Sequence, residues 1–270
     1  MTVQNAIDLL LDKYCGGAHI EPTCDIMTVG SPDMELTGVV CTFMATVDVI
    51  RKANELGANF IITHEPTWFN GMDITDWCEN DSVYLAKKKL LEDLGMTVWR
   101  FHDHMHMGAQ TDFIYEGLLE ALGWRKYLTA DEALPWVYQI PKTTLKDLAL
   151  FFKETLGMDV IQTIGRPDCP VSRVGILVGG GTLGLGREVM PMEVMERNHL
   201  NVIVGGDIYE WTLCAYINDA QQLGMDRAMI TLGHERSEEA GMEYLPRLLQ
   251  PLLPGIPVHF VSAEEPFIYY

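Results

Sequence analysis

The sequence has little positive charge, no paired-cysteine motif and no long hydrophobic run. Its 270 residues include 19 Lys and Arg against 38 Asp and Glu, a formal net charge of −19 at pH 7. Proteins that bind nucleic acids need a Lys/Arg surface that displaces counterions from phosphates, and proteins that bind anionic membrane surfaces need a similar one. The charge balance therefore argues against both partners. It suits a protein that concentrates cations, although solubility alone explains any single carboxylate.

The six cysteines are scattered and form no CxxC pair, which predicts reduced, mostly buried thiols and a cytoplasmic protein. No run approaches the roughly 20 apolar residues of a membrane-spanning helix. From Val3 to Tyr14, apolar residues recur at helical spacing and charged residues interrupt them. This pattern predicts an amphipathic core helix rather than a signal peptide.

Strands and helices alternate along most of the chain. The predicted strands are Leu36–Phe43, Asn59–Thr63, Thr97–Phe101, Leu134–Ile140, Val160–Ile164, Val174–Val178, Asn201–Val204, Arg227–Leu232 and Val258–Ser262. The predicted helices after the first are Ala45–Leu56, Ser82–Leu94, Asp112–Leu122, Leu145–Leu156, Glu188–Asn198, Tyr209–Leu223 and Glu235–Leu249. Such alternation is typical of α/β proteins with mostly parallel sheets flanked by helices. Because it occurs twice, we expect two similar lobes, residues 1–130 and residues 131–270.

Three of the predicted strands run into polar clusters. The first cluster contains His64 and Glu65, the second is the segment His102–His106, and the third holds His234 and Glu238 at the start of a helix. The carboxyl ends of strands form the usual ligand crevice of open α/β sheets. Imidazole and carboxylate together suit Zn, Fe, Mn or Ni. Two such ions would polarise a substrate and lower the pKa of a bridging water.

Each cluster alone also has a structural interpretation. A single histidine at a strand end is more often a hydrogen-bonded structural residue than a ligand. Glu235 and Glu238 suit the helix dipole without any metal. Three histidines and an aspartate within His102–His106 are harder to explain in this way, and the three clusters together predict a metal site.

These clusters, in this order, resemble the NIF-three-like family, also called the GTP cyclohydrolase I type 2 family, whose members hold a dinuclear metal centre. The likeness extends from about Cys24 to Met242. It is carried by four segments, which read GANFIITHEPTWF, WRFHDHMH, VIVGGDIYEW and TLGHERSEEAGM.

The resemblance implies a two-lobed α/β protein with two divalent transition metal ions, Zn, Fe, Mn or Ni, in a cleft at the C-terminal ends of the strands. The ligands that it implies are His64, Glu65, His106, His234 and Glu238. The residues that support the ligands or act as acid and base would then be His102, Asp103 and His104. In this chain Glu65 stands where the family has a second His, and His106 stands where it has an Asp. The metal and the ligands within His102–His106 therefore stay open.

The resemblance further implies a metal-dependent hydrolase that activates water and acts on a small molecule such as a nucleotide. It also implies ring-shaped homo-oligomers, with a hexamer as the expected assembly. The alternative from another class is a metal-binding regulatory or scaffold protein without catalysis.

A third possibility is an NAD-binding protein. Gly179–Gly184 follows a predicted strand and spells GxGxxG, and Asp207 ends the next strand where a ribose-binding acid would stand. Gly186 and Pro191 make a poor start for the helix that this motif requires. We therefore favour a loop that lines the metal cleft, where its N–H groups would hold a phosphate or carboxylate. Asp207 and Trp211 would line the same cleft, although Asp207 also suits a helix N-cap.

Overall fold

The chain divides into two compact units. The computed structural model describes residues 1–17, 20–108, 111–129, 136–184 and 190–270. Unit 1 comprises Met1–Gly117 and Glu239–Glu264, and unit 2 comprises Leu118–Glu238 and Glu265–Tyr270. The predicted lobe boundary between residues 130 and 131 lies outside the described residues, as do Gly186 and the predicted starts of a strand at Leu134 and of a helix at Glu188.

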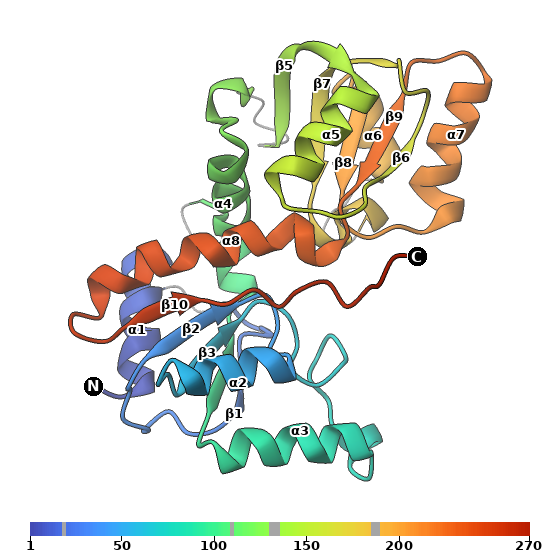
Figure 1. Cartoon of the computed structure of the whole chain (residues 1–270). Coiled ribbons are helices and arrows are strands. Elements are labelled where there is room, and N and C mark those ends of the chain that lie inside the picture. The colour runs from blue at the N-terminus through green and yellow to red at the C-terminus, as the bar shows by residue number, and fades with distance from the viewer. Residues whose placement is uncertain (18–19, 109–110, 130–135, 185–189) are drawn as a thin grey trace. The chain divides into compact units, whose positions relative to one another are not determined.

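The sheet of unit 1 has five strands in the order β1-β4-β3-β2-β10. They are β1 (Met27–Val29), β2 (Val39–Thr42), β3 (Phe60–Thr63), β4 (Thr97–Arg100) and β10 (Val258–Phe260). The four strands from β4 to β10 are parallel, and β1 pairs antiparallel with β4 at the edge. The sequence patterns did not predict β1. They also grouped the last strand with the second segment, whereas β10 lies beside β2 in the first sheet (Figure 1).

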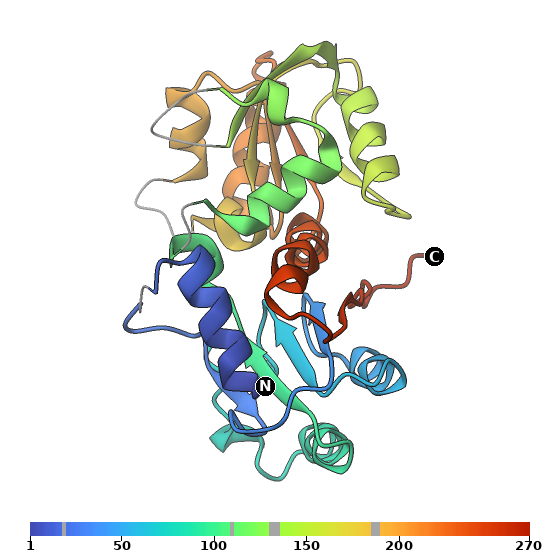
Figure 2. The ribbon, with the colours of Figure 1, turned by 90° about the vertical axis from the view of Figure 1, so that its left-hand side faces the viewer.

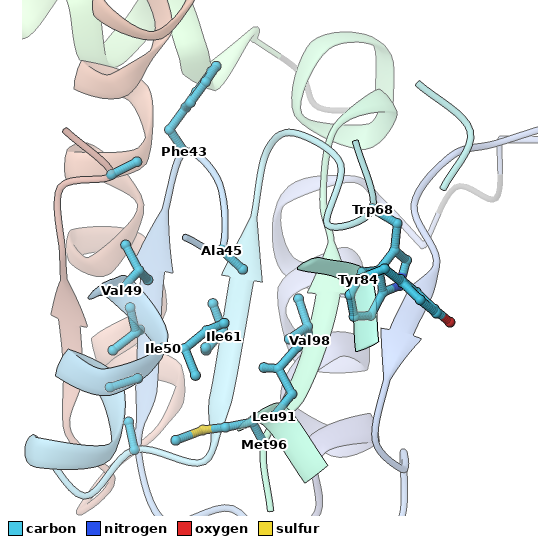
Figure 3. Packing of buried hydrophobic residues seen from close by; sticks show 14 of the residues in the cluster. Phe43, Ala45, Val49, Ile50, Ile61, Trp68, Tyr84, Leu91, Met96 and Val98 are labelled. Atoms are coloured by element: carbon cyan, nitrogen blue, oxygen red, sulfur yellow. The ribbon is translucent and has the colours of Figure 1, made fainter. Parts of the chain in front are cut away.

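Helices cover both faces of this sheet. They are α1 (Val3–Tyr14) on one face and α2 (Val47–Glu55) and α3 (Ser82–Asp93) on the other (Figure 2). The strand register aligns Val40, Ile61 and Val98 on the face toward α2 and α3. Val49 and Ile50 of α2 pack against them (Figure 3). Burying each such aliphatic side chain contributes about 1.5–3 kcal/mol, so the period-3.6 pattern of α2 decides which face it presents.

The sheet of unit 2 also has five strands, in the order β5-β7-β8-β9-β6. They are β5 (Val137–Thr144), β6 (Gln162–Ile164), β7 (Pro170–Leu177), β8 (Val202–Gly205) and β9 (Ala228–Thr231). The helices between them are α5 (Leu145–Thr155), α6 (Pro191–Arg197) and α7 (Ala215–Gln222). The central strands β7, β8 and β9 are parallel, and both edge strands are antiparallel. Ile203 and Met229 on one face pack against Val194 of α6 and Ile217 of α7.

The α/β class and the flanking helices are confirmed, and both sheets are mixed. β7 begins before the predicted strand because Pro170 and Val171 pair with Thr144 and Thr143 of the edge strand β5. Proline is tolerated there as the first residue of a strand. None of the helices in the described ranges is long and apolar enough to cross a membrane.

Two further helices, α4 (Phe113–Leu122) and α8 (His234–Leu249), contain the boundaries between the units. Within unit 1 the backbones of these two helices come into contact at Gly117 and Gly241. A Cβ atom on Gly241 would lie 2.5 Å from the Cα of Ile114, and one on Gly117 would overlap the carbonyl oxygen of Ala240. The two backbones therefore touch at a distance that no side chain permits.

We expect Gly241→Ala to destabilise unit 1, although alanine is the better helix former by about 1 kcal/mol. The added methyl would have to push α4 away from α8, and overpacking of this kind costs about 1–3 kcal/mol. The urea midpoint of unfolding measures the change. Glu243→Ala, at an exposed position of the same helix, serves as the control. A Gly241→Ala protein more stable than the wild type would contradict the close contact.

Candidate metal centre

Three histidine rings gather at the C-terminal ends of β3 and β4 in unit 1. His64 follows β3, and His102 and His106 follow β4. The ring centroids of His64 and His102 are 4.5 Å apart, and each lies 5.0 Å from that of His106. One nitrogen from each ring lies within 4.8 Å of the other two. His102, which the sequence placed beside the predicted ligands, lies in one group with His64 and His106.

The Nδ1 atom of each of these rings faces a hydrogen-bond acceptor. An acceptor at Nδ1 keeps the proton there and leaves the lone pair on Nε2, which is the arrangement found in metal-binding histidines. The contacts are His64 Nδ1 to Phe101 O at 3.2 Å, His102 Nδ1 to Asp103 Oδ1 at 3.0 Å and His106 Nδ1 to Asp112 Oδ2 at 2.8 Å.

The lone pairs on two of these rings face each other. The Nε2 atoms of His64 and His106 are 3.2 Å apart. With both Nδ1 atoms protonated, this contact is repulsive unless a proton or a cation lies between the nitrogens. The donor set is therefore compatible with a cation site.

Asp25 holds the backbone of the segment that carries these histidines. Its carboxylate accepts the N–H groups of His102 and Asp103 at 2.7 Å and of His104 at 3.0 Å. His104 also donates from Nδ1 to Asp25 at 2.7 Å, and its Nε2 accepts the N–H of Ile20 at 3.2 Å. His104 is only 4% exposed. Both ring nitrogens of His104, a predicted acid–base residue, are thus engaged in structural contacts. His104 lies outside the group of three rings.

Asp103 is a carboxylate that orients His102. It also accepts hydrogen bonds from Thr23 Oγ1 and from the N–H of Cys24, each at 2.9 Å. Burial raises the pKa of Asp103, but the hydrogen bonds from Cys24, His102 and Thr23 outweigh burial and hold the pKa well below its usual range. Burial also raises the pKa of the Cys24 thiol to about 12, so that thiol is neutral. Cys24, His102 and Asp103 form a second group with ligand spacing.

Arg100 joins Glu65 to the backbone around it. This arginine is 4% exposed, and its guanidinium donates to the carbonyl oxygens of His64 at 3.1 Å and Gly71 at 2.6 Å. Its third contact is Glu65 Oε2 at 3.4 Å, while Glu65 Oε1 lies 3.8 Å from His102 Nε2. A buried carboxylate is tolerated when a charged partner balances it. Arg100 supplies that charge beside the predicted ligand Glu65.

Unit 2 contains a second cluster, built in the same way. His234 follows β9, and its Nδ1 lies 2.8 Å from Asp207 Oδ2 at the end of β8. Its Nε2 lies 3.2 Å from Glu238 Oε2, one turn further along α8. The structure therefore brings together the predicted pair His234 and Glu238 and adds Asp207 as the residue that orients His234.

The glycine-rich loop packs directly against this pair. Gly179 opens a short 3-10 helix (Gly179–Leu183) with φ of +49°, and its N–H donates to Ser237 Oγ at 2.9 Å. A Cβ atom on Gly179 would lie 2.8 Å from His234 Nε2 and would overlap Glu238 Oε1. The GxGxxG pattern thus has a packing role here, since only glycine leaves room for both ligand candidates.

Several contributing residues were missed by the sequence patterns. Asp112 precedes α4, and its Oδ1 accepts the N–H groups of Ile114 at 3.0 Å and Tyr115 at 3.2 Å. The preference for Asp at helix starts could have marked it as a cap, but not as a partner of His106. No local pattern marks Asp25, because its contacts are 77 to 79 residues away.

Oriented imidazoles and carboxylates at the strand ends of an α/β protein are donors of the kind that transition metals take. Residues 26–266 match the family model described as Duf34/NIF3 (NGG1p interacting factor 3). The chain belongs to this family, and the resemblance carried by the four segments is confirmed.

Relatives and solved structures agree with this assignment. A GTP cyclohydrolase 1 type 2 homolog of Clostridium perfringens is 21% identical over 220 residues, which covers 78% of this chain and 77% of the relative. One from Lactococcus lactis is 25% identical over 187 residues, 68% of each chain. The fold matches a Bacillus cereus protein related to NIF3 with a TM-score of 0.76, at 15% identity and over 100% of this chain and 99% of that one. Staphylococcus aureus protein SA1388 matches with a TM-score of 0.73 at 19% identity, with the same coverage.

The pKa of His102 leads to a testable pH dependence in metal-free protein. Burial first, and the neighbouring His64 and His106 after it, lower this pKa from 6.5 to about 4. Between these two values the unfolded chain binds more protons than the folded chain. Stability should therefore fall as the pH decreases from 6.5 to about 4, by up to about 3 kcal/mol from this residue.

Urea unfolding across this pH range measures the effect. His102→Gln should show a shallower decline, whereas His199→Asn, at an exposed histidine, should keep the wild-type slope. Equal slopes for the wild type and His102→Gln would refute the assignment.

A second prediction concerns Gly179→Ala, which should displace the side chain of Glu238 or His234. We expect metal affinity to fall by about 10–100-fold, the usual effect of disturbing groups that support a ligand. Gly224→Ala is the matched control, because Gly224 also has a positive φ (+81°) but nothing within 4 Å of its Cβ position. Metal titration of both variants separates the clash with the candidate ligands from the strain of a positive φ. An equal loss in both variants would show that backbone conformation, and not the contact with the ligands, is responsible.

Proposed function

We propose that this protein is a metal-dependent hydrolase with a dinuclear centre. The observation that carries the proposal is the set of three imidazoles whose Nδ1 atoms are each held by an acceptor. The proposed ligands are those expected from the sequence, His64, Glu65, His106, His234 and Glu238, together with His102.

The donor chemistry fits transition metals. Burial and neighbouring histidines keep the pKa of His102 near 4, so this imidazole is neutral and able to coordinate at neutral pH. Glu65 lies beside the imidazoles of unit 1, and Cys24 is close enough to His102 to be a further candidate once its thiol loses its proton. Imidazole with carboxylate suits Zn, Fe, Mn or Ni, and the donor set does not choose among them.

A divalent cation bound there would supply Lewis acidity and make a water molecule acidic enough to attack a substrate near neutral pH. The protein's own groups would orient the site. Asp112 and Asp207 would hold the Nδ1 protons of His106 and His234, and Asp103 would do so for His102. Because the pKa of Asp103 is held well below its usual range, it would act as a fixed acceptor and not as a proton donor.

The substrate class follows from the relatives only in outline. Their name, GTP cyclohydrolase 1 type 2 homolog, suggests hydrolysis of a nucleotide-like small molecule. With a net charge of −19, the protein would need its bound cations to attract such an anion. The ring-shaped homo-oligomer, with a hexamer as the expected form, is part of the same proposal, and light scattering in solution tests it.

Elemental analysis of protein purified without chelators tests the metal centre. We expect about two equivalents of transition metal per chain, and a large loss in the double variant His64→Ala/His234→Ala. His199→Asn, which lies outside both clusters, should bind as the wild type does. Less than one equivalent of metal in the wild type, or an unchanged metal content in the double variant, would contradict the two-metal proposal.

Activity is tested separately, by following GTP and other nucleotides for metal-dependent hydrolysis. Hydrolysis that disappears with chelation and returns with metal would support the enzyme. Full metal occupancy without turnover of any nucleotide would instead favour a metal-binding regulatory or scaffold protein.

A further inference from the structure

Two aromatic side chains of unit 2 are stacked on each other in an exposed position. Tyr209 is 52% exposed and Trp211 is 77% exposed. Their ring centroids are 5.7 Å apart and their planes differ by only 5°. Single exposed apolar residues are ordinary on protein surfaces. Two parallel rings that leave most of the indole uncovered form a flat aromatic surface instead.

The backbone around the rings is fixed by local bonds. The N–H and Oγ1 of Thr212 both donate to the carbonyl oxygen of Tyr209, at 3.1 Å and 2.9 Å. The residues Glu210–Cys214 form a π-helical turn in which Thr212 has non-helical φ and ψ. Such turns are rare and are frequent at functional sites. The stacked pair is therefore held by the turn before any ligand arrives.

The pair follows the C-terminal end of β8 closely. Asp207, two residues before Tyr209, holds Nδ1 of His234 at 2.8 Å. The ends of parallel strands are where open α/β sheets bind their ligands. Glu210, an exposed residue between the two aromatic positions, adds a carboxylate, which accepts hydrogen bonds and so suits a ligand with N–H donors.

We propose that Tyr209 and Trp211 form a stacking platform for a planar nitrogen heterocycle of purine size in the substrate. This inference rests on the proposed function, since it names the part of the substrate that the protein would recognise. A flat aromatic surface suits a planar fused ring. Stacking on an aromatic side chain contributes binding free energy whatever the identity of the base. A protein partner is less well matched. The exposed parts of two rings are well below the roughly 800 Å² that each side of a stable interface buries, so a protein partner would need many further contacts.

Equilibrium dialysis with guanosine tests the platform, on metal-free and on metal-loaded protein. We expect saturable binding at about 1 mM or below, weakened about tenfold by Trp211→Ala and less by Trp211→Phe, which keeps a ring. Trp77→Ala is the matched control, because Trp77 is 61% exposed but belongs to unit 1. Ribose, which has no aromatic ring, should not compete.

Three results would overturn the platform. They are no saturable guanosine binding, equal binding by the wild type and Trp211→Ala, or a Trp211→Ala protein of altered mass in light scattering whose assembly guanosine does not affect. The last would identify the pair as a contact between subunits. Metal content is measured in the same samples. Guanosine binding by a protein that contains no metal would therefore support the platform and contradict the metal centre. Bound metal without guanosine binding would support the metal centre and contradict the platform.

Discussion

The hydrogen bond from Nδ1 of a histidine to a fixed acceptor is the interaction on which the rest of the candidate site depends. In unit 1 it sets the lone pairs of His64, His102 and His106, and in unit 2 Asp207 does the same for His234. Without these acceptors the rings could exchange tautomers and satisfy one another through ordinary hydrogen bonds. With them, Nε2 atoms are held at close range, and a proton or a cation between two of them would remove their repulsion.

Holding neutral imidazoles close together costs stability, and the backbone contacts around them offset that cost. Asp25 binds three consecutive N–H groups of the segment after β4. Arg100 binds two carbonyl oxygens of the loop after β3. Both segments leave the ends of neighbouring parallel strands, so the sheet brings their first residues together and these two charged side chains fix the rest of each loop. The two loops that carry the candidate ligands are thus each tied down by a charged side chain.

Much of the fold was predictable from local patterns, whereas the partners of the site residues were not. The helix Val3–Tyr14 begins and ends where its apolar spacing indicated, and the strand ends before His64 and His102 follow from short buried runs. The contacts of Asp25 join positions almost eighty residues apart, and no spacing rule reaches that far. The return of β10 to the first sheet was missed for the same reason, since strand order depends on topology and not on local hydrophobicity.

Two of the candidate ligands owe their charge balance to a neighbouring side chain. Arg100 contacts Glu65, so the pair together is close to neutral. Asp112 faces Nδ1 of His106, so an imidazole without charge of its own is paired with a carboxylate. The charge that each candidate ligand presents therefore depends on its neighbour. A donor set of this kind is read from the ligands and their partners together, because the partners set both the charge and the position of the protons.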